Sequence, residues 1–401
     1  MLVLVYTYYY TDRGLADVYK YFDDGKVIYD NMCLHPSATL KVMTGLGYNA
    51  ADPDIKTVVA NTHHFDKPGG VFESNHRLII RFNAILCFFS YCNIYVHTLI
   101  FCFLSFMGLI ALYRSLLPFF EEGLGRILII PVFLVPSVLF WSSGLLKETL
   151  IIFFLGTLMF TAMKLLEMKN IITNLLLSAL CIHFLYLSKP FVALSFILSF
   201  YVMSTFYFKG YMRIIALLVA MLGISWFLYA HQTFVCGMMA SLISKRNEFT
   251  ELGLKMKAGS LVDSRIYTSD CTLPLKLLPL GLYDMFMQPF IWSKGLLEKL
   301  FGTENLLVLL CSLCSLFMFK RPVNQKKQLV AFSTTFFLLN YALIGITVPI
   351  IGALVRYKVF GLIFYLILVI CHVDLNKFIF YIKSKDTSNF ILEKSKFLLF
   401  K

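Results

Sequence analysis

The sequence predicts an all-α protein that crosses a membrane about nine times. Composition is the first reason: the 401-residue chain is 59% hydrophobic and only 15% charged, whereas soluble domains carry about 25% charged residues. The second reason is that several stretches approach the roughly 20 apolar residues that cross a bilayer as a helix. The third is that polar residues gather in two long blocks, 1–82 and 231–303.

Nine apolar stretches are the predicted spans. They are 93–113, 127–141, 145–163, 171–187, 190–208, 211–230, 304–319, 329–348 and 354–372. The chain then divides into five regions. These are an N-terminal region 1–82, a first bundle of about six helices 83–230, a loop region 231–303, three last helices 304–372 and a basic tail 373–401. The two polar blocks are too long for simple connectors, which favours functional loops.

Basic residues predict the orientation, because Lys and Arg gather in cytoplasmic loops. If the Lys-rich tail 373–401 is cytoplasmic, alternation through nine spans places most basic residues of the short loops on the same side. The regions 1–82 and 231–303 then face outside. The high content of Phe, Ile, Lys and Asn is typical of an AT-rich bacterial genome. We therefore expect a bacterial inner-membrane protein with its N-terminal region outside and its C-terminus inside.

Export of the N-terminal region needs a segment that the sequence does not contain. The opening MLVLVYTYYY is too short to span a bilayer and lacks the basic start of a signal peptide. We expect the native chain to begin upstream with one more helix. The alternative is that residues 1–82 are cytoplasmic and the alternation is wrong by one span.

The net charge of +13 concerns topology and lipid headgroups, because no nucleic-acid-binding motif accompanies it. Cys33 and Cys271 lie in polar segments and are candidates for a disulfide if both face an oxidising side. A CxxC motif lies in an apolar run without polar partners, so neither a metal nor a redox role is expected for it. Adjacent His63 and His64, near Asp66, cannot share one helix face, and we expect a solvated loop there.

Lys147 and Glu148 stand between two predicted spans, in the stretch FWSSGLLKETL. A charge near a bilayer costs several kcal/mol unless it is paired, hydrated or functional. One interpretation is a hydrated turn anchored at the interface by Trp141. The other is that the turn projects both charges into a polar cavity, where Glu148 positions a substrate and Lys147 meets a phosphate.

Lys189 and Arg356 lie in two further turns on the same predicted side. Each alone is typical of a side chain that snorkels to the interface. Together with Lys147 they place three basic turns on the side that positive charge normally avoids, which favours an anionic ligand. Pro349 and Gly352 indicate a broken entry to the last helix, tolerated only where it lines a protein cavity.

An acidic and aromatic helix is predicted in the N-terminal region. Asp17, Tyr21 and Asp24 are three or four residues apart and share one helix face. Carboxylates bond sugar hydroxyls and aromatic rings stack on pyranose faces, so this face suits sugar recognition. It equally suits packing on the membrane surface.

The stretches LADVYKYF and PSVLFWSSGLLKETL resemble the first and second external loops of the GT-C superfamily of polytopic glycosyltransferases. They also resemble those of O-antigen-type polysaccharide polymerases. The resemblance implies Asp17 and Glu148 as catalytic acids. It implies Lys147, Lys189 and Arg356 as candidates to hold the lipid phosphate. Tyr21 and Trp141 complete the expected set of substrate-binding residues. Two features depart from the family pattern: no helix precedes the first acid, and a single Asp17 stands where an acidic pair is expected.

The resemblance implies a membrane enzyme that transfers sugar from a polyprenyl-phosphate-linked donor on the extracytoplasmic face, in cell-surface glycan assembly. The expected partners are membrane lipid, the lipid-linked glycan and other envelope-assembly proteins, with no nucleic acid. No cofactor beyond the donor is expected, and a divalent cation stays open. A flippase or transporter is the alternative, although charges at helix ends and the lack of a visible repeat disfavour it. A non-catalytic membrane scaffold is the third interpretation.

Overall fold

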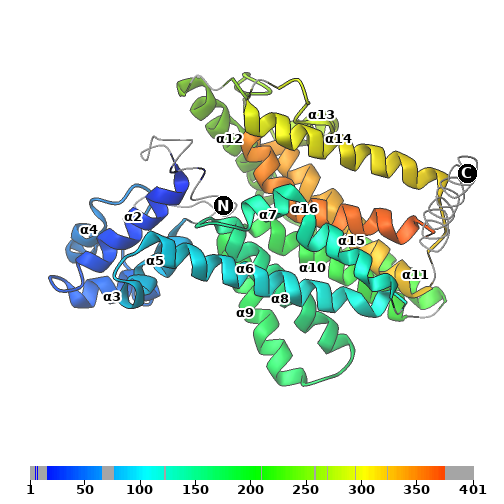
Figure 1. Ribbon diagram of the computed structural model, residues 1–401, viewed down its shortest axis with the longest axis horizontal. Helices are drawn as coiled ribbons and strands as arrows, with labels where there is room; N and C mark the ends of the chain where they lie inside the picture. Colours follow the sequence, from blue (N-terminus) through cyan, green and yellow to red (C-terminus); the bar gives the residue numbers. More distant parts are fainter. Residues whose placement is uncertain are drawn as a thin grey trace, which may run out of the picture.

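The computed structural model describes residues 5, 7, 16–65, 76–121, 123–208, 210–256, 259–268, 270–293, 295–322 and 324–374. The helices are α2 (Asp17–Asp30), α3 (Pro36–Thr44), α4 (Pro53–Val59), α5 (Arg77–Ser90), α6 (Ile94–Leu116), α7 (Pro136–Trp141), α8 (Lys147–Leu166), α9 (Ile171–Ser188), α10 (Pro190–Ser204), α11 (Tyr211–Ala230), α12 (Gln232–Lys255), α13 (Leu273–Met287), α14 (Leu296–Phe317), α15 (Asn324–Thr347) and α16 (Ile351–His372). Figure 1 shows α2–α5 gathered at one end of a bundle of long helices.

The prediction of an all-α polytopic protein is confirmed in its coarse form. Within the described residues, eight helices are long and apolar enough to cross a membrane. They correspond to eight of the nine predicted spans, and their ends differ from the predictions by a few residues, most at the start of α14. Most of the predicted tail 373–401, together with Asp66, lies outside the described residues.

The predicted span 127–141 does not form a continuous helix. It is divided into a 3₁₀ turn, a π-helical turn that contains Pro131, and the short helix α7, which begins at Pro136. Proline removes a backbone donor and clashes with the preceding turn, which explains the breaks. The segment runs beside α6, because Phe133 packs against Phe106 and Tyr113.

Helices α6 and α8 run in the same direction. The hydroxyl of Ser105 in α6 donates to the carbonyl of Ser142, just before α8, at 2.8 Å. Gly108, one turn further along α6, lies against the backbone of Ile152 and Phe153 in α8. The broken segment therefore returns the chain along α6 to the end from which α8 departs (Figure 1). The broken segment thus crosses back along the bundle where the sequence predicts one continuous helix, 127–141.

Small residues let two pairs of helices approach closely. Gly156 of α8 faces the backbone of Gly108 in α6, where an added Cβ would meet the Gly108 carbonyl. Gly281 of α13 faces Gly345 of α15 in the same way. Close backbone contact of this kind drives helix association in lipid, where apolar burial between helices gives little.

The N-terminal region folds as four helices, α2 to α5. Val18, Tyr21 and Ile28 of α2 are fully buried and belong to the same core as Val58 and Ile79. Of the expected face of α2, Tyr21 and Asp24 are fully buried, whereas the side chain of Asp17 is 37% exposed. Asp24 accepts hydrogen bonds from the backbone of His63 and His64 and from the His63 ring at 2.7–2.9 Å. The loop predicted to be solvated is therefore tied to α2.

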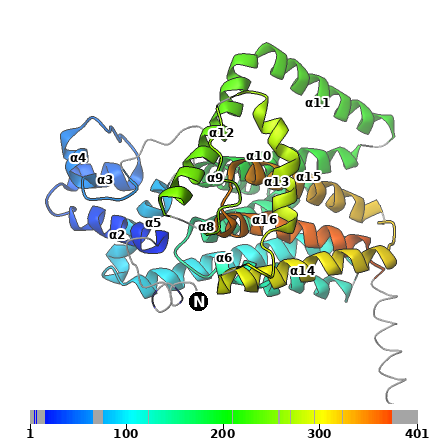
Figure 2. The ribbon, with the colours of Figure 1, turned by 90° about the horizontal axis from the view of Figure 1, so that it is seen from above.

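The region 231–303 is largely helical, whereas the sequence predicts a loop region there. It contains α12, α13 and a connecting strap, which we define as residues 259–268. The predicted pairing of Cys33 with Cys271 is wrong: Cys271 forms a disulfide with Cys236 of α12, and Cys33 is free and exposed. A second disulfide joins Cys87 to Cys92 between α5 and α6. Helix α11 stands apart from the bundle, with none of its residues buried (Figure 2).

Candidate functional site

Arg356 joins two carboxylates that come from distant parts of the chain. Its Nη1 donates to Oδ2 of Asp17 at 2.9 Å, and its Nη2 lies 2.8 Å from Oε2 of Glu148. Asp17 opens α2, Glu148 lies in the first turn of α8, and Arg356 lies in the second turn of α16. Carboxylates in the first turn of a helix are favoured by the helix dipole, so both acids occupy positions that suit them locally.

Lys189 adds a second cation to Glu148. Its Nζ lies 3.4 Å from Oε1 of Glu148, and it stands 2.9 Å from the ring centroid of Tyr357. Lys189 occupies the single residue between α9 and α10, where the next residue, Pro190, begins the new helix. The tight turn therefore fixes the backbone from which Lys189 reaches the cluster.

The remaining predicted residues lie in the same place. The guanidinium carbon of Arg356 is 5.9 Å from the ring centroid of Trp141. Tyr21 lies one turn after Asp17. Burial and then the charge of Asp17 raise the pKa of its hydroxyl, and Arg356 opposes this with a smaller effect. Lys147 precedes Glu148 at the start of α8 and contributes to the field at Asp17. All seven predicted site residues thus meet at one end of the bundle.

Burial changes how these charges must be understood. Glu148 is fully buried, Lys189 is 1% exposed and Lys147 is 2% exposed. A hydrated turn at Lys147 and Glu148 and a snorkelling Lys189 are therefore both wrong, because each requires a side chain in contact with water. The cluster is graded, since the side chain of Arg356 is 11% exposed and that of Asp17 is 37% exposed. Only Asp17 has substantial access to solvent.

The charges are not fully satisfied by hydrogen bonds. Neither carboxylate oxygen of Glu148 makes a hydrogen bond of good geometry to the described residues, nor does Nζ of Lys189. Burying paired charges returns little stability after the cost of desolvation, even when the pairing is good. Within the described residues, Lys189 and Arg356 both approach Glu148, and Arg356 also pairs with Asp17. Buried charges that perturb one another in this way gather at functional sites.

Titration at the exposed end follows from the same contacts. Burial alone would raise the pKa of Asp17, but Arg356, with a smaller effect of Lys147, holds that pKa below its usual value. Asp17 is therefore ionised at neutral pH. His76 was not predicted, and its Nδ1 shares a hydrogen bond of 2.8 Å with the hydroxyl of Tyr21. Burial and the charges of Lys147, His64 and Arg356 lower the pKa of His76, so its imidazole is neutral.

A cavity of about 350 Å³ adjoins the charged cluster. Its wall is formed by the end of α7, the first turns of α14 and α16, and the strap, and it includes Trp141, Phe301, Glu298, Ser260, Gly352 and Arg356. Gly352, part of the predicted broken entry to the last helix, lies in the first turn of the continuous helix α16 and lines this cavity. Arg356 thus belongs both to the charged cluster and to the cavity wall.

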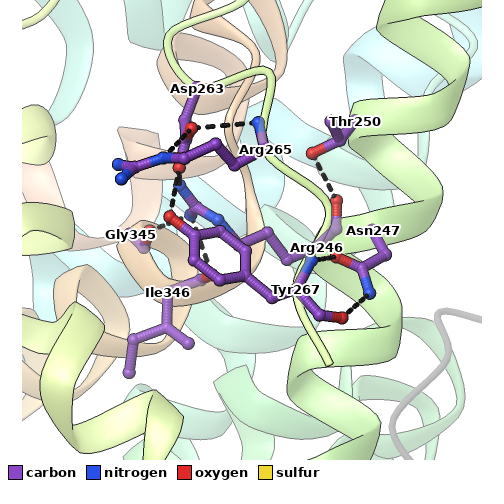
Figure 3. A network of polar contacts seen from close by, with 8 residues as sticks. All are labelled: Arg246, Asn247, Thr250, Asp263, Arg265, Tyr267, Gly345 and Ile346. Atoms are coloured by element: carbon purple, nitrogen blue, oxygen red, sulfur yellow. Dashed lines mark hydrogen bonds and ion pairs between the residues drawn. The ribbon is translucent and has the colours of Figure 1, made fainter. Parts of the chain in front are cut away.

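The strap is anchored by a buried polar network (Figure 3). Arg246 of α12, 2% exposed, donates to Asp263 at 3.0 Å and to the carbonyls of Gly345 and Ile346 at 3.3 and 3.1 Å. The hydroxyl of Tyr267 donates to the same carboxylate at 2.8 Å. Those two carbonyls end α15, where the helix itself supplies no donors. The network holds the strap where Ser260 forms part of the cavity wall.

Two further polar contacts join the helices that form the opposite wall. Glu304 of α14 accepts from the amide and hydroxyl of Ser137 in α7 at 2.7 and 2.6 Å. Lys358 of α16 donates to Asn305 of α14 and to the carbonyl of Gln288, both at 3.0 Å. Neither these residues nor the strap network could be recognised from the sequence. Their only signal is that charged and amide side chains occur inside apolar segments.

No group of three or more His, Cys, Asp or Glu side chains suited to a metal ion occurs in the part of the chain that the structure describes. Both carboxylates of the charged cluster are engaged by cations of the protein itself. Among the described residues of the cluster, Arg356 is the cation that reaches the cavity wall, and Asp17 is the acid with substantial access to solvent.

Compared with known protein families, curated proteins and solved structures, the chain matches none of them. The resemblance to polytopic glycosyltransferases therefore depends on the two short stretches that carry Asp17 and Glu148.

Proposed function

We propose that this protein is a membrane glycosyltransferase or polysaccharide polymerase. In this proposal it transfers a sugar from a polyprenyl-phosphate-linked donor to a glycan hydroxyl on the extracytoplasmic face. The observation that carries the proposal is the bridge from Asp17 through Arg356 to Glu148, with Lys189 beyond it. The bridge runs from the partly exposed Asp17 to the buried Glu148 and Lys189. Such a change from hydrated to buried surroundings suits a substrate that has a polar sugar and a lipid tail.

In the proposed reaction Asp17 accepts the proton of the acceptor hydroxyl as that oxygen attacks the anomeric carbon of the donor. The bond from the anomeric carbon to the phosphate oxygen breaks, and the electron pair leaves with the lipid phosphate. Arg356 and Lys189 stabilise the negative charge that develops there. A general base of this kind contributes about 10²–10⁴-fold to the rate.

Binding of the donor phosphate would also raise the basicity of Asp17. Arg356 now lowers the pKa of Asp17. If the donor phosphate takes over part of the guanidinium, that effect weakens and Asp17 becomes more basic when the donor is present. Glu148 holds Arg356 and Lys189 apart from bulk solvent and aligned with each other, which is a positioning role.

The test uses purified protein in liposomes, a lipid-linked sugar and an acceptor glycan. Wild type should form a glycosidic bond, and Glu148→Gln should lose at least about 100-fold in rate, because the groups that Glu148 aligns are then misplaced. Glu167→Gln is the matched control, because Glu167 forms an ion pair with Lys164 at the far end of the same helix, α8. Movement of the lipid-linked sugar across the bilayer without bond formation would instead establish a transporter. Full activity of Glu148→Gln would refute the site.

The same variants can be examined in cells. A deletion strain should lose or shorten a surface glycan, wild-type protein should restore it, and Glu148→Gln should fail to restore it at equal abundance. Unchanged glycans in the deletion strain, with tight co-purification of another membrane protein, would favour a scaffold.

A further inference from the structure

The cavity beside Arg356 combines apolar surface with a few polar groups. Phe301 and Trp141 supply aromatic surface, with their ring centroids 6.1 Å apart. Glu298, Ser260 and Arg356 supply the polar part of the lining. A volume of about 350 Å³ is near the lower end of the range for ligand pockets, about 300–1,000 Å³. It suits a single small ring better than an oligosaccharide.

The carboxylate of Glu298 and the aromatic rings decide what the cavity can hold. A polyprenyl tail would place hydrocarbon against the carboxylate of Glu298, which is costly for a charged group. A sugar ring supplies hydroxyl donors for Glu298 and C–H groups for the rings of Trp141 and Phe301, both of which line the cavity.

The charged residues of the described wall, Arg356 and Glu298, limit the class of sugar that the cavity can bind. Arg356 is engaged by Asp17 and Glu148 and, in the proposed function, by the donor phosphate. Glu298 lies in the first turn of α14, where its side chain also receives the backbone N–H of Gly295 at 3.4 Å. A second carboxylate in the cavity would face Glu298, and like charges brought together are strongly disfavoured.

We propose that this cavity binds the sugar ring attached to the donor phosphate, and that Glu298 selects neutral or amino sugars over uronic acids. The inference rests on the proposed function for the identity of the phosphate-linked group. It goes beyond that function by naming the sugar class and the residue that selects it. Arg356 connects the two parts, because it reaches both the charged cluster and the cavity.

The three tryptophans of the chain permit a direct measurement. Trp226 and Trp292 are 68% and 77% exposed, so Trp226→Phe and Trp292→Phe together leave Trp141 as the only tryptophan, which is excited at wavelengths that tyrosine does not absorb. The variant is placed in lipid nanodiscs and titrated with three probes: farnesyl diphosphate, farnesyl diphosphoglucose and farnesyl diphosphoglucuronate. We expect Trp141 fluorescence to change with the glucose probe and to stay constant with farnesyl diphosphate, even where that probe competes for binding.

Selectivity is tested by Glu298→Gln in the same background. The glucose probe should bind at least about 10-fold more tightly than the glucuronate probe to the parent, since the two differ by one like-charge contact. Glu298→Gln should reduce this ratio to about 3-fold or less. Glu251→Gln, an exposed carboxylate on α12, should leave the ratio unchanged. Equal binding of both sugar probes to the parent would overturn the selective role of Glu298.

Gly352→Leu tests the cavity itself. A Cβ at Gly352 meets no atom within 4 Å, so a leucine fits the helix and fills the mouth of the cavity. It should abolish the Trp141 response to the glucose probe, whereas Gly223→Leu on α11, also in open space, should not. If farnesyl diphosphate alone changes Trp141 fluorescence as the glucose probe does, the cavity holds the lipid and this inference is wrong. If the protein transfers sugar but Trp141 fluorescence does not change with the glucose probe, this inference is wrong and the proposed function stands. If Trp141 fluorescence changes with the glucose probe but no sugar is transferred, only the proposed reaction is wrong.

Discussion

Arg356 donates to Asp17 at 2.9 Å across a sequence separation of 339 residues. This contact closes α16 onto the N-terminal region and defines the exposed end of the charged cluster. It also couples the ionisation of Asp17 to whatever binds Arg356, because the guanidinium is the main group that lowers the pKa of Asp17.

The first prediction concerns this pair. Asp17→Asn and Arg356→Lys should each lower the transfer rate by about 10²-fold or more, since one removes the base and the other removes a two-pronged contact that lysine cannot make. Because both act on one unit, the double variant should be little worse than the poorer single variant. The measurement is the initial rate of all four proteins at equal abundance. Independent, multiplying losses would show that the two residues do not act together.

The second prediction concerns pH and the strap. Burial would raise the pKa of Asp263, but hydrogen bonds from Tyr267, the Arg265 backbone and Arg246 lower it from its ordinary value of 3.8. A lowered pKa stabilises the folded strap at pH values above about 4, and this contribution is lost as the pH falls through the folded-state pKa. Hydrogen exchange in residues 259–268, corrected for its intrinsic rate, should therefore accelerate only in acid.

Asp263→Asn should give fast exchange of the strap already at pH 7, with little further change in acid. The control is Asp30→Asn, which removes an exposed ion pair with Lys26. Slow exchange in Asp263→Asn would mean that the network in Figure 3 does not anchor the strap.

The third prediction concerns helix packing. Gly156→Val places a side chain against the Gly108 carbonyl and should destabilise the protein by about 1–3 kcal/mol or more, as overpacking does. Gly223→Val on α11 meets open space and should change the midpoint of thermal unfolding in nanodiscs much less. Equal midpoints for the two variants would contradict the close approach of α6 and α8.

The fourth prediction concerns orientation. Cys33 is free and exposed, whereas Cys236 and Cys271 are joined. If both regions face the oxidising side, a membrane-impermeant maleimide should label Cys33 in intact spheroplasts, and should label Cys236 and Cys271 only after reduction. A cysteine introduced by Glu167→Cys should be labelled only after lysis. The reverse pattern would invert the predicted topology.

The sequence was sufficient to predict most spans and the members of the charged cluster. Apolar length identifies helices such as α16 without any tertiary information. Charges at the ends of spans, such as Glu148 and Lys189, indicate a site, because a charged side chain near the bilayer costs free energy unless it is paired or functional. The sequence could not show that these charges bind one another, since their partners are fixed by packing between helices that are far apart in the chain.

Two kinds of error have physical causes. The segment 127–141 is apolar enough for a span, but Pro131 and Pro136 determine its backbone, and average hydropathy does not register proline. The strap network depends on Arg246 and Asp263, which are ordinary charged residues in a polar stretch until α15 supplies carbonyls for Arg246. Burial of a charge becomes visible only when the covering element is known.

The distance in sequence between Glu148 and Arg356 also bears on how the protein is made. Helix α8 must enter the membrane long before α16 has been synthesised. During that interval Glu148 has only Lys189, 41 positions later, as its described ion-pair partner from the growing chain. Until then, Lys189 is the described cation that pairs with Glu148. Under the proposed function, a chain that still lacks α16 would lack Arg356 and could not transfer sugar.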